Sequence, residues 1–227
     1  TGFSATRKLP TWAARPFKDS EASEGESPQA VVFADCFNRY FEPENLRATL
    51  KVMEAADVPV HLAKAPKGER PLCCGRTFLS AGLIDEAKVE AQRLVDALMP
   101  YVEQGLPIIG LEPSCLLTLR DEIPALLPGE DTSKLAAKAR MLEEYIADQE
   151  ANPDFHLPLT SPAPKVLLHG HCHQKAMGIM SSIEKTLALL PNTQGETVET
   201  SCCGMAGAFG YGTDTHETSR AMAELDL

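Results

Sequence analysis

Residues 72–75 read Leu72-Cys73-Cys74-Gly75, and residues 201–204 read Ser201-Cys202-Cys203-Gly204. Two such pairs of adjacent cysteines are unusual in a chain of 227 residues that has only seven cysteines. Each pair is preceded by one further cysteine that follows a short apolar run, and the first pair is also followed by one. These outlying residues are Cys36, Cys172 and Cys115. The repetition indicates an internal duplication that builds two related sulfur-rich sites.

Short apolar runs alternate with amphipathic stretches on both sides of these motifs. We expect strands at 31–34, 58–62, 106–111 and 165–168, with a further short strand around Val198. Helical spacing predicts helices between them, one of which carries Leu135, Ala139, Leu142 and Ile146. A long helix from Ile84 should kink or end at Pro100. Strands that alternate with helices predict an α/β fold with parallel strands, and the loops at their carboxyl ends are where such folds place sites.

The predicted fold class is therefore α/β, with two tandem related α/β units that contain short parallel sheets. Residues 1–29 lack apolar periodicity and are predicted to be a linker. The first repeat unit with its trailing helices covers 30–150, and the proline-rich segment 151–164 is a connector. The second repeat unit covers 165–227. Because its last helical pattern runs to Leu227, we expect this unit to be incomplete.

The overall charge indicates which kinds of partner the chain would not bind by electrostatic attraction. The net charge is −11 and the isoelectric point is near 5.0, without a cluster of Lys and Arg. This balance argues against nucleic acid as a partner and against charge-driven binding to anionic lipid. No apolar run approaches the roughly 20 residues that a membrane-spanning helix needs. The chain opens without Met and without a secretory signal, which suggests part of a longer polypeptide.

The cysteines are better suited to ligation than to disulfide formation. Their number is odd, adjacent cysteines rarely pair with each other, and cytosolic thiols stay reduced. Thiolates are soft ligands that suit iron–sulfur clusters and zinc. Two thiolates at consecutive positions could bind two different metal atoms of a compact cluster. We therefore predict seven metal or cofactor ligands: Cys36, Cys73, Cys74, Cys115, Cys172, Cys202 and Cys203.

Four residues close in sequence to the predicted ligands each have two possible roles. His169, His171 and His173 flank Cys172, and they would either ligate zinc or a Rieske-like iron or support the thiolates by hydrogen bonds. We favour the supporting role, which is common around metal ligands. Glu112 is either an oxygen ligand beside Cys115 or, more commonly, the cap of a turn. Nucleophilic catalysis by Cys172 is disfavoured because no oxyanion motif or orienting acid accompanies it, so no catalytic residue is predicted.

Residues 30–227 resemble the cysteine-rich CCG domain family, whose pattern is a cysteine, then Cys-Cys-Gly, then Cys-x-x-Cys, usually present twice. That family includes the catalytic subunit of heterodisulfide reductase, the iron–sulfur subunits of glycolate oxidase and anaerobic glycerol-3-phosphate dehydrogenase, and lactate-utilisation proteins. The stretches 111–115 and 202–211 look like the C-terminal region of large FAD-linked oxidases of the D-lactate dehydrogenase type.

The resemblance implies an iron–sulfur electron-transfer domain, with a cluster of the 4Fe-4S type, in a flavin-dependent 2-hydroxy acid oxidoreductase. Its partners would be an FAD-binding domain, a ferredoxin-like segment and an electron acceptor. The chain would be a domain of an FAD-linked oxidoreductase rather than a complete enzyme. It would reside in the cytoplasm or, through its partners, at the periphery of the inner membrane.

This sequence departs from the family pattern at two places. Glu112 stands where the first cysteine of Cys-x-x-Cys would be, and the second copy has no such motif after Cys203. Zinc is therefore the alternative occupant, and a zinc-stabilised docking domain of the same enzyme is the alternative function. A thiol–disulfide enzyme like heterodisulfide reductase is the third.

Overall fold

The computed structural model describes residues 2–23, 25, 27–161 and 163–226. The chain divides into two compact units, each of which is considered by itself. The first unit is Trp12–Thr160, and the second combines Thr1–Thr11 with Ser161–Leu227. Each unit holds one parallel sheet with helices, so the predicted α/β class with short parallel sheets is confirmed.

The sheet of the first unit has four strands in the order β2-β1-β3-β4. They are β1 (Ala30–Val32), β2 (Val60–Leu62), β3 (Ile108–Gly110) and β4 (Ala139–Met141). All neighbouring pairs are parallel. The first three strands lie where the apolar runs predict them.

The fourth strand corrects a prediction. We expected one helix to carry Leu135, Ala139, Leu142 and Ile146, but β4 separates α7 (Glu130–Lys138) from α8 (Leu142–Asp148). Ala139 turns to extended backbone directly after α7, and the following residues pair with β3. Because this pairing is a tertiary contact, helical spacing alone does not reveal it.

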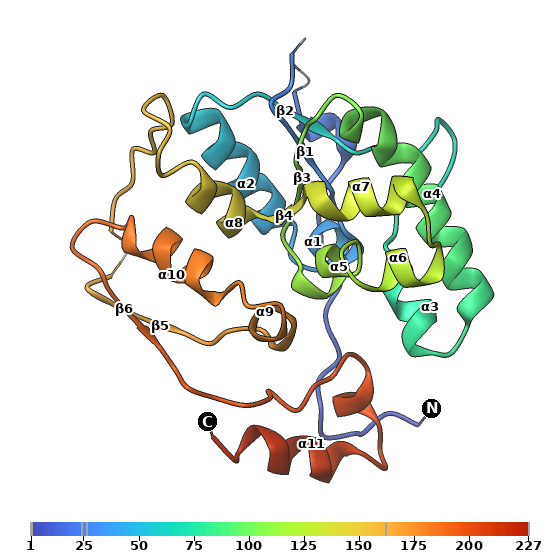
Figure 1. Cartoon of the computed structure of the whole chain (residues 1–227). Coiled ribbons are helices and arrows are strands. Elements are labelled where there is room, and N and C mark those ends of the chain that lie inside the picture. The colour runs from blue at the N-terminus through green and yellow to red at the C-terminus, as the bar shows by residue number, and fades with distance from the viewer. Residues whose placement is uncertain (1, 24, 26, 162, 227) are drawn as a thin grey trace. The chain divides into compact units, whose positions relative to one another are not determined.

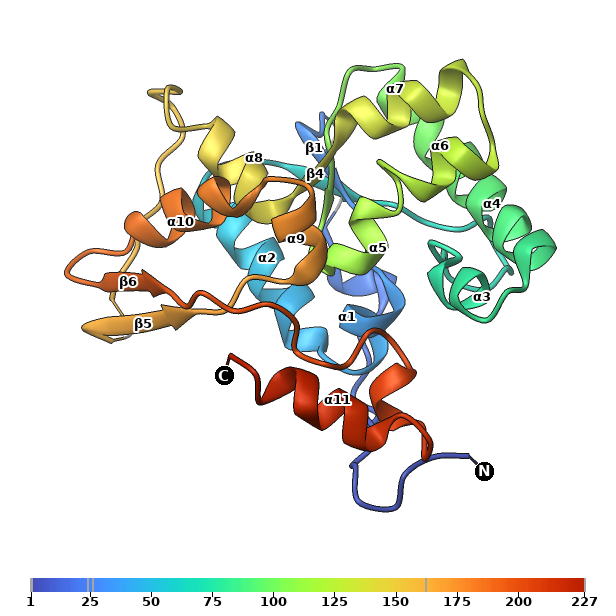
Figure 2. The ribbon, with the colours of Figure 1, turned by 60° about the horizontal axis from the view of Figure 1, so that its bottom comes forward.

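Helices cover both faces of this sheet, as Figures 1 and 2 show: α2 (Pro43–Ala55) and α8 on one face, α4 (Ile84–Val102) and α7 on the other. On the α2 face, Val32, Leu46 and Met53 belong to one buried cluster. Successive strand residues point to opposite faces, so the buried Val31 serves the other layer. The result is the three-layer arrangement that leaves the strand ends free for a site.

The long helix α4 does not stop at its proline. It continues to Val102, so Pro100 lies in its last turn, and Gly105 follows with a positive φ of 83°. Short helices complete the unit at the ends of strands and loops. They are α1 (Cys36–Tyr40), α3 (Arg76–Ser80), α5 (Pro113–Leu117) and α6 (Glu122–Leu126).

Residues 12–23 pack against the rest of the first unit. Phe17 is buried in the same cluster as Leu46, and its backbone N–H donates to the carbonyl of Arg39 at 2.9 Å. A short 3-10 helix, η1 (Asp19–Glu21), follows, and Asp19 forms an ion pair with Arg39 at 2.6 Å.

The second unit contains β5 (Lys165–Leu168) and β6 (Gln194–Thr197), which pair in parallel. Its helices are α9 (Cys172–Ala176), α10 (Met180–Ala188) and α11 (His216–Ala223), with the 3-10 helix η2 (Phe209–Tyr211) before α11. Gly195 lets α10 approach β6, because a Cβ there would lie 2.6 Å from a methyl of Leu187. The N-terminal arm joins this unit where Ser4 donates to the carbonyl of Tyr211 at 2.7 Å.

Among the described residues, no helix combines the length and apolar character that crossing a membrane requires.

Candidate metal centre

Three loops of the first unit place cysteines beyond the carboxyl ends of its strands. Cys36 begins α1 after β1, and Cys115 lies in the first turn of α5 after β3. Cys73 and Cys74 follow β2 and directly precede α3. Because β1, β2 and β3 are parallel neighbours, these loops meet at one edge of the sheet.

Carboxylates fix two of these loops. Asp35 accepts a hydrogen bond from the backbone N–H of Asn38 at 3.0 Å, and Glu112 accepts one from that of Cys115 at 2.7 Å. Both are therefore N-caps, and the capping role proposed for Glu112 is confirmed. Burial raises the pKa of Asp35, against the lowering effect of the Asn38 side-chain amide. The sequence signal for this cap is an acid between a strand and Cys36.

The four thiols of the first unit form a continuous series of contacts. Cys36 hydrogen-bonds to Cys73, Cys73 to Cys74, and Cys74 to Cys115. The bond to Cys73 raises the pKa of Cys36, and the same bond, with that from Cys74, holds the pKa of Cys73 well below its usual range. The N–H of Gly75 and the charge of Arg70 also stabilise a thiolate at Cys73. Cys73 is therefore the thiol of the four that ionises most readily.

The remaining two sulfurs are the deepest. Cys74 and Cys115 are each only 5% exposed. Donation to the Cys115 and Cys73 sulfurs, together with burial, raises the pKa of Cys74. For Cys115 the bond from Cys74 lowers the pKa, but burial and the nearby negative charges outweigh it and raise the pKa to about 11. In the absence of a cation these two thiols are kept protonated, and a bound metal would displace their protons.

Gly75 makes the Cys-Cys-Gly turn possible. Its φ is +78°, which glycine adopts at little cost, and it is the N-cap of α3. A Cβ at this position would lie 2.9 Å from the backbone carbonyl oxygen of Ala87 in α4. The turn therefore rests directly on the backbone of α4, and no larger residue fits there without a shift.

The second unit repeats this turn. Cys172 begins α9 after β5, and its thiol hydrogen-bonds to Cys202 and lies close to Cys203. Burial raises the pKa of Cys172, and the Cys202 side chain adds to this. Gly204, with φ of +75°, donates its N–H to the sulfur of Cys202 at 3.3 Å. The matching bond from Gly75 to Cys73 measures 3.5 Å.

The three histidines lie around the loop that carries Cys172. His169 Nδ1 is 2.8 Å from the hydroxyl of Thr200, and His171 Nδ1 accepts from the N–H of His173 at 3.1 Å. The rings of His171 and His173 stack with centroids 5.2 Å apart. None of these contacts involves a cysteine sulfur, so both the supporting role and ligation by the three histidines stay predictions.

The donor chemistry of the first unit fits a thiophilic metal or cluster. All seven cysteines are free thiols. Within the described ranges, no group of three or more His, Cys, Asp or Glu side chains is arranged so that it could hold a metal ion. The four thiols linked in series are nevertheless the donor type that iron–sulfur clusters and zinc bind.

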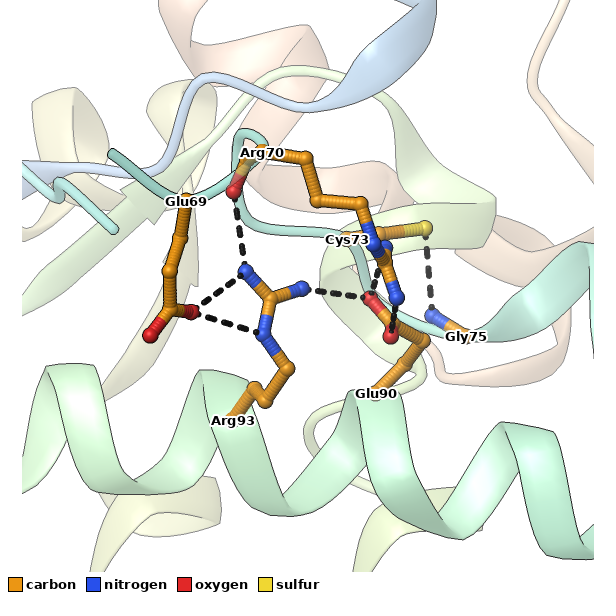
Figure 3. A network of polar contacts seen from close by, with 6 residues as sticks. All are labelled: Glu69, Arg70, Cys73, Gly75, Glu90 and Arg93. Atoms are coloured by element: carbon orange, nitrogen blue, oxygen red, sulfur yellow. Dashed lines mark hydrogen bonds and ion pairs between the residues drawn. The ribbon is translucent and has the colours of Figure 1, made fainter. Parts of the chain in front are cut away.

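The sequence patterns do not predict the polar network that lies beside Cys73. Glu90 lies on the buried face of α4, where it forms ion pairs with Arg70 and Arg93 (Figure 3). One signal was available in the sequence: Glu90 interrupts the apolar face that Ala87 and Leu94 define. Its partner Arg70 lies 20 residues earlier, and helical periodicity does not connect the two.

An α/β scaffold that carries two Cys-Cys-Gly turns defines a class of cysteine-rich domains. The cysteine-rich CCG domain family matches residues 30–120 and 166–226, and the chain belongs to this family. The two matched segments correspond to the two copies of the repeated motif.

Named relatives share this region. One subunit of the anaerobic glycerol-3-phosphate dehydrogenase of Escherichia coli strain K12 is 28% identical over 198 residues, which are 86% of this chain and 48% of that protein. D-2-hydroxyglutarate dehydrogenase of the same strain is 24% identical over 211 residues, 91% of this chain and 19% of that protein. Lactate utilization protein A of Bacillus velezensis is 26% identical over 191 residues, 78% of this chain and 73% of that protein.

The chain thus spans about half the length of the glycerol-3-phosphate dehydrogenase subunit and about a fifth of D-2-hydroxyglutarate dehydrogenase. By their names, these relatives are components of oxidoreductases. The similarity to these relatives agrees with the assignment of the chain to the cysteine-rich CCG family.

Proposed function

We propose that the chain is the iron–sulfur electron-transfer domain of a flavin-dependent 2-hydroxy acid oxidoreductase of the lactate or glycolate type. The contact series Cys36–Cys73–Cys74–Cys115 carries the proposal. The family match and the dehydrogenase names of the relatives support it. FAD would be held by another domain or subunit, next to a ferredoxin-like segment, and an acceptor would receive the electrons.

In this proposal the four thiolates of the first unit hold a cluster of the 4Fe-4S type, which supplies one-electron exchange. The chain's own residues position and shield these ligands. Asp35 and Glu112 hold the first turns of α1 and α5, and the N–H of Gly75 donates to the Cys73 sulfur. The burial of Cys74 and Cys115 excludes water from that side. In the second unit, the proposed ligands are Cys172, Cys202 and Cys203.

The decisive experiment is to reconstitute the chain anaerobically with iron and sulfide. We expect a broad visible absorption band and, in one redox state, an EPR signal, with stoichiometric iron and sulfide. A Ser80→Ala variant, altered in α3 outside the thiol set, serves as the control and should load equally. A colourless chain that instead retains one tight zinc per site would overturn the proposal.

That second outcome would favour the zinc-stabilised docking domain, because the same four thiolates suit zinc. Chelation should then unfold the chain, since structural zinc contributes directly to folding. The thiol–disulfide enzyme has its own supporting observation in the stabilised thiolate of Cys73. Turnover of a small disulfide by the chain alone would favour it.

A further inference from the structure

Glu90 is a carboxylate on the buried face of α4. Its side chain is only 1% exposed, although its neighbours on that face are Ala87, Ala91 and Leu94. A buried carboxylate is costly unless cations and hydrogen bonds surround it. Glu90 has both: Arg70 donates one nitrogen to each of its oxygens, and Arg93 donates from Nη1 at 2.9 Å.

The same network fixes Arg70 at its backbone. The carbonyl of Arg70 accepts from Nη2 of Arg93 at 2.9 Å, and Arg93 also pairs with Glu69 at 3.3 Å. Figure 3 shows the resulting order of side chains from Glu69 through Arg93 and Glu90 to Arg70. A two-pronged contact with a carboxylate restricts both the position and the plane of a guanidinium. Arg70 is therefore held in one orientation even though its side chain is 58% exposed.

The network ends at the Cys-Cys-Gly turn. A Cβ on Gly75 would lie 3.3 Å from the Cβ of Glu90, so Glu90 packs directly against the turn. The guanidinium of Arg70 lies beside the side chain of Cys73 in Figure 3, and its charge interacts with both Cys73 and Cys36. Arg70 thus brings a positive charge from the network to these two sulfurs.

We propose that Arg70, held in place by Glu90, is a fixed cation that raises the reduction potential of the group bound at Cys36 and Cys73. The inference rests on the proposed function. A group held by Cys36 and Cys73 would gain one negative charge on accepting an electron from the proposed flavin partner, and no bond or proton would need to move. A cation at a fixed distance stabilises this more negative state more than the oxidised state. Arg70 thus tunes the potential, and Glu90 is a positioning residue.

The test is an EPR-monitored redox titration of the loaded full chain. Arg70→Gln should make the reduction equilibrium about tenfold less favourable, which is about 59 mV more negative for one electron. Arg70→Lys keeps the positive charge but loses the two-pronged contact with Glu90, so the shift of the reduction potential should be smaller. The control Arg47→Gln removes the same charge from α2, where Arg47 pairs with Glu21 and Glu44, and should leave the potential unchanged. An unchanged potential in a fully loaded Arg70→Gln chain would refute the proposal.

Glu90→Gln separates positioning from direct charge. If Glu90 acted only through its own negative charge, removing that charge would raise the potential. If it positions Arg70, the variant should lower the potential, and it should have no such effect in the Arg70→Gln background. A raised potential in Glu90→Gln would therefore contradict the positioning role.

A metal-free measurement distinguishes this inference from the proposed function. If the chain takes up no cluster, the proposed function fails, yet the field of Arg70 can still be read from thiol reagents. In the apo chain, an anionic aromatic disulfide should modify Cys73 faster than a neutral one, because a fixed cation attracts the anion. Arg70→Gln should reduce this rate ratio several-fold, and salt should reduce it in the parent chain. A ratio that Arg70→Gln leaves unchanged, measured by mass spectrometry at Cys73, would overturn the inference.

Discussion

The two Cys-Cys-Gly turns are built alike but surrounded differently. In both, a glycine with left-handed backbone donates its N–H to the sulfur two residues earlier and rests against the backbone of a later helix. In the first unit Cys74 and Cys115 are buried, whereas the three cysteines of the second unit are all partly exposed. The turn is therefore a local device, and the depth of the sulfurs depends on the unit around it.

The two turns also differ in where in the sequence their neighbouring arginine comes from. Arg70 precedes its turn by a few residues and is held by Glu90. In the second unit, Arg7 of the N-terminal arm donates to Ser219 Oγ at 3.1 Å and to Met205 Sδ at 3.0 Å, close to Gly204. One turn is thus supported by its own flanking sequence, and the other by a segment about two hundred positions away.

The largest effect should come from removing a sulfur from one unit at a time. Cys73→Ser should abolish iron uptake by the first unit, because it removes the central thiolate of the contact series. Cys172→Ser should remove only the iron of the second unit. Iron and sulfide per chain measure both variants. If each variant lost all iron, the two sites would not be independent of each other.

The next largest effect concerns the cores. Leu94 is fully buried in the first unit, so Leu94→Ala should destabilise that unit by about 2–5 kcal/mol. Among the described residues of the second unit, only Ile179 and Ile183 are buried hydrophobic residues, and Ile183→Ala should cost about 2 kcal/mol or less. Urea unfolding followed by hydrogen exchange would resolve the units. Equal protection of both units in the parent chain would contradict this difference in core size.

The glycines of the turns should show a smaller, steric effect. Gly75→Ala combines about 1–2 kcal/mol for left-handed backbone with a clash against α4, so we expect about 3 kcal/mol in total. Gly204→Ala should behave in the same way against Ser219. Gly82 is the matched control, since its φ is +75° but no atom lies within 4 Å of its Cβ site. Thermal unfolding would show equal costs for Gly75→Ala and Gly82→Ala if the helix contact were unimportant.

The smallest effect should come from the N-terminal arm. Arg7→Ala removes two partly buried contacts and should destabilise the second unit by about 1 kcal/mol. Faster amide exchange around residues 205–219 is the expected readout. Lys8→Ala, at an exposed neighbouring position, is the control and should leave these rates unchanged. Identical exchange in both variants would mean that Arg7 does not support the turn.

The spacing of apolar residues predicted most of the strands and helices, because it reflects interactions between residues close together in the sequence. The buried runs around Val31, Val60 and Ile108 became parallel strands, and the helical spacing from Ile84 became α4. It failed at Ala139, where a strand is stable only because β3 lies beside it. Periodicity also did not anticipate the buried Phe17, whose partners belong to α2 and β1.

The sequence alone determined that there are two Cys-Cys-Gly turns, that each has an upstream cysteine after a strand, and that the fold is α/β. These features depend on residue type and local spacing, and both are visible in a linear chain. Only the tertiary structure decided which sulfurs touch, how deeply each is buried, and that Arg70 and Glu90 meet beside Cys73. Contacts of this kind join residues far apart in sequence, because parallel strands and packed helices bring distant loops to one edge of the sheet.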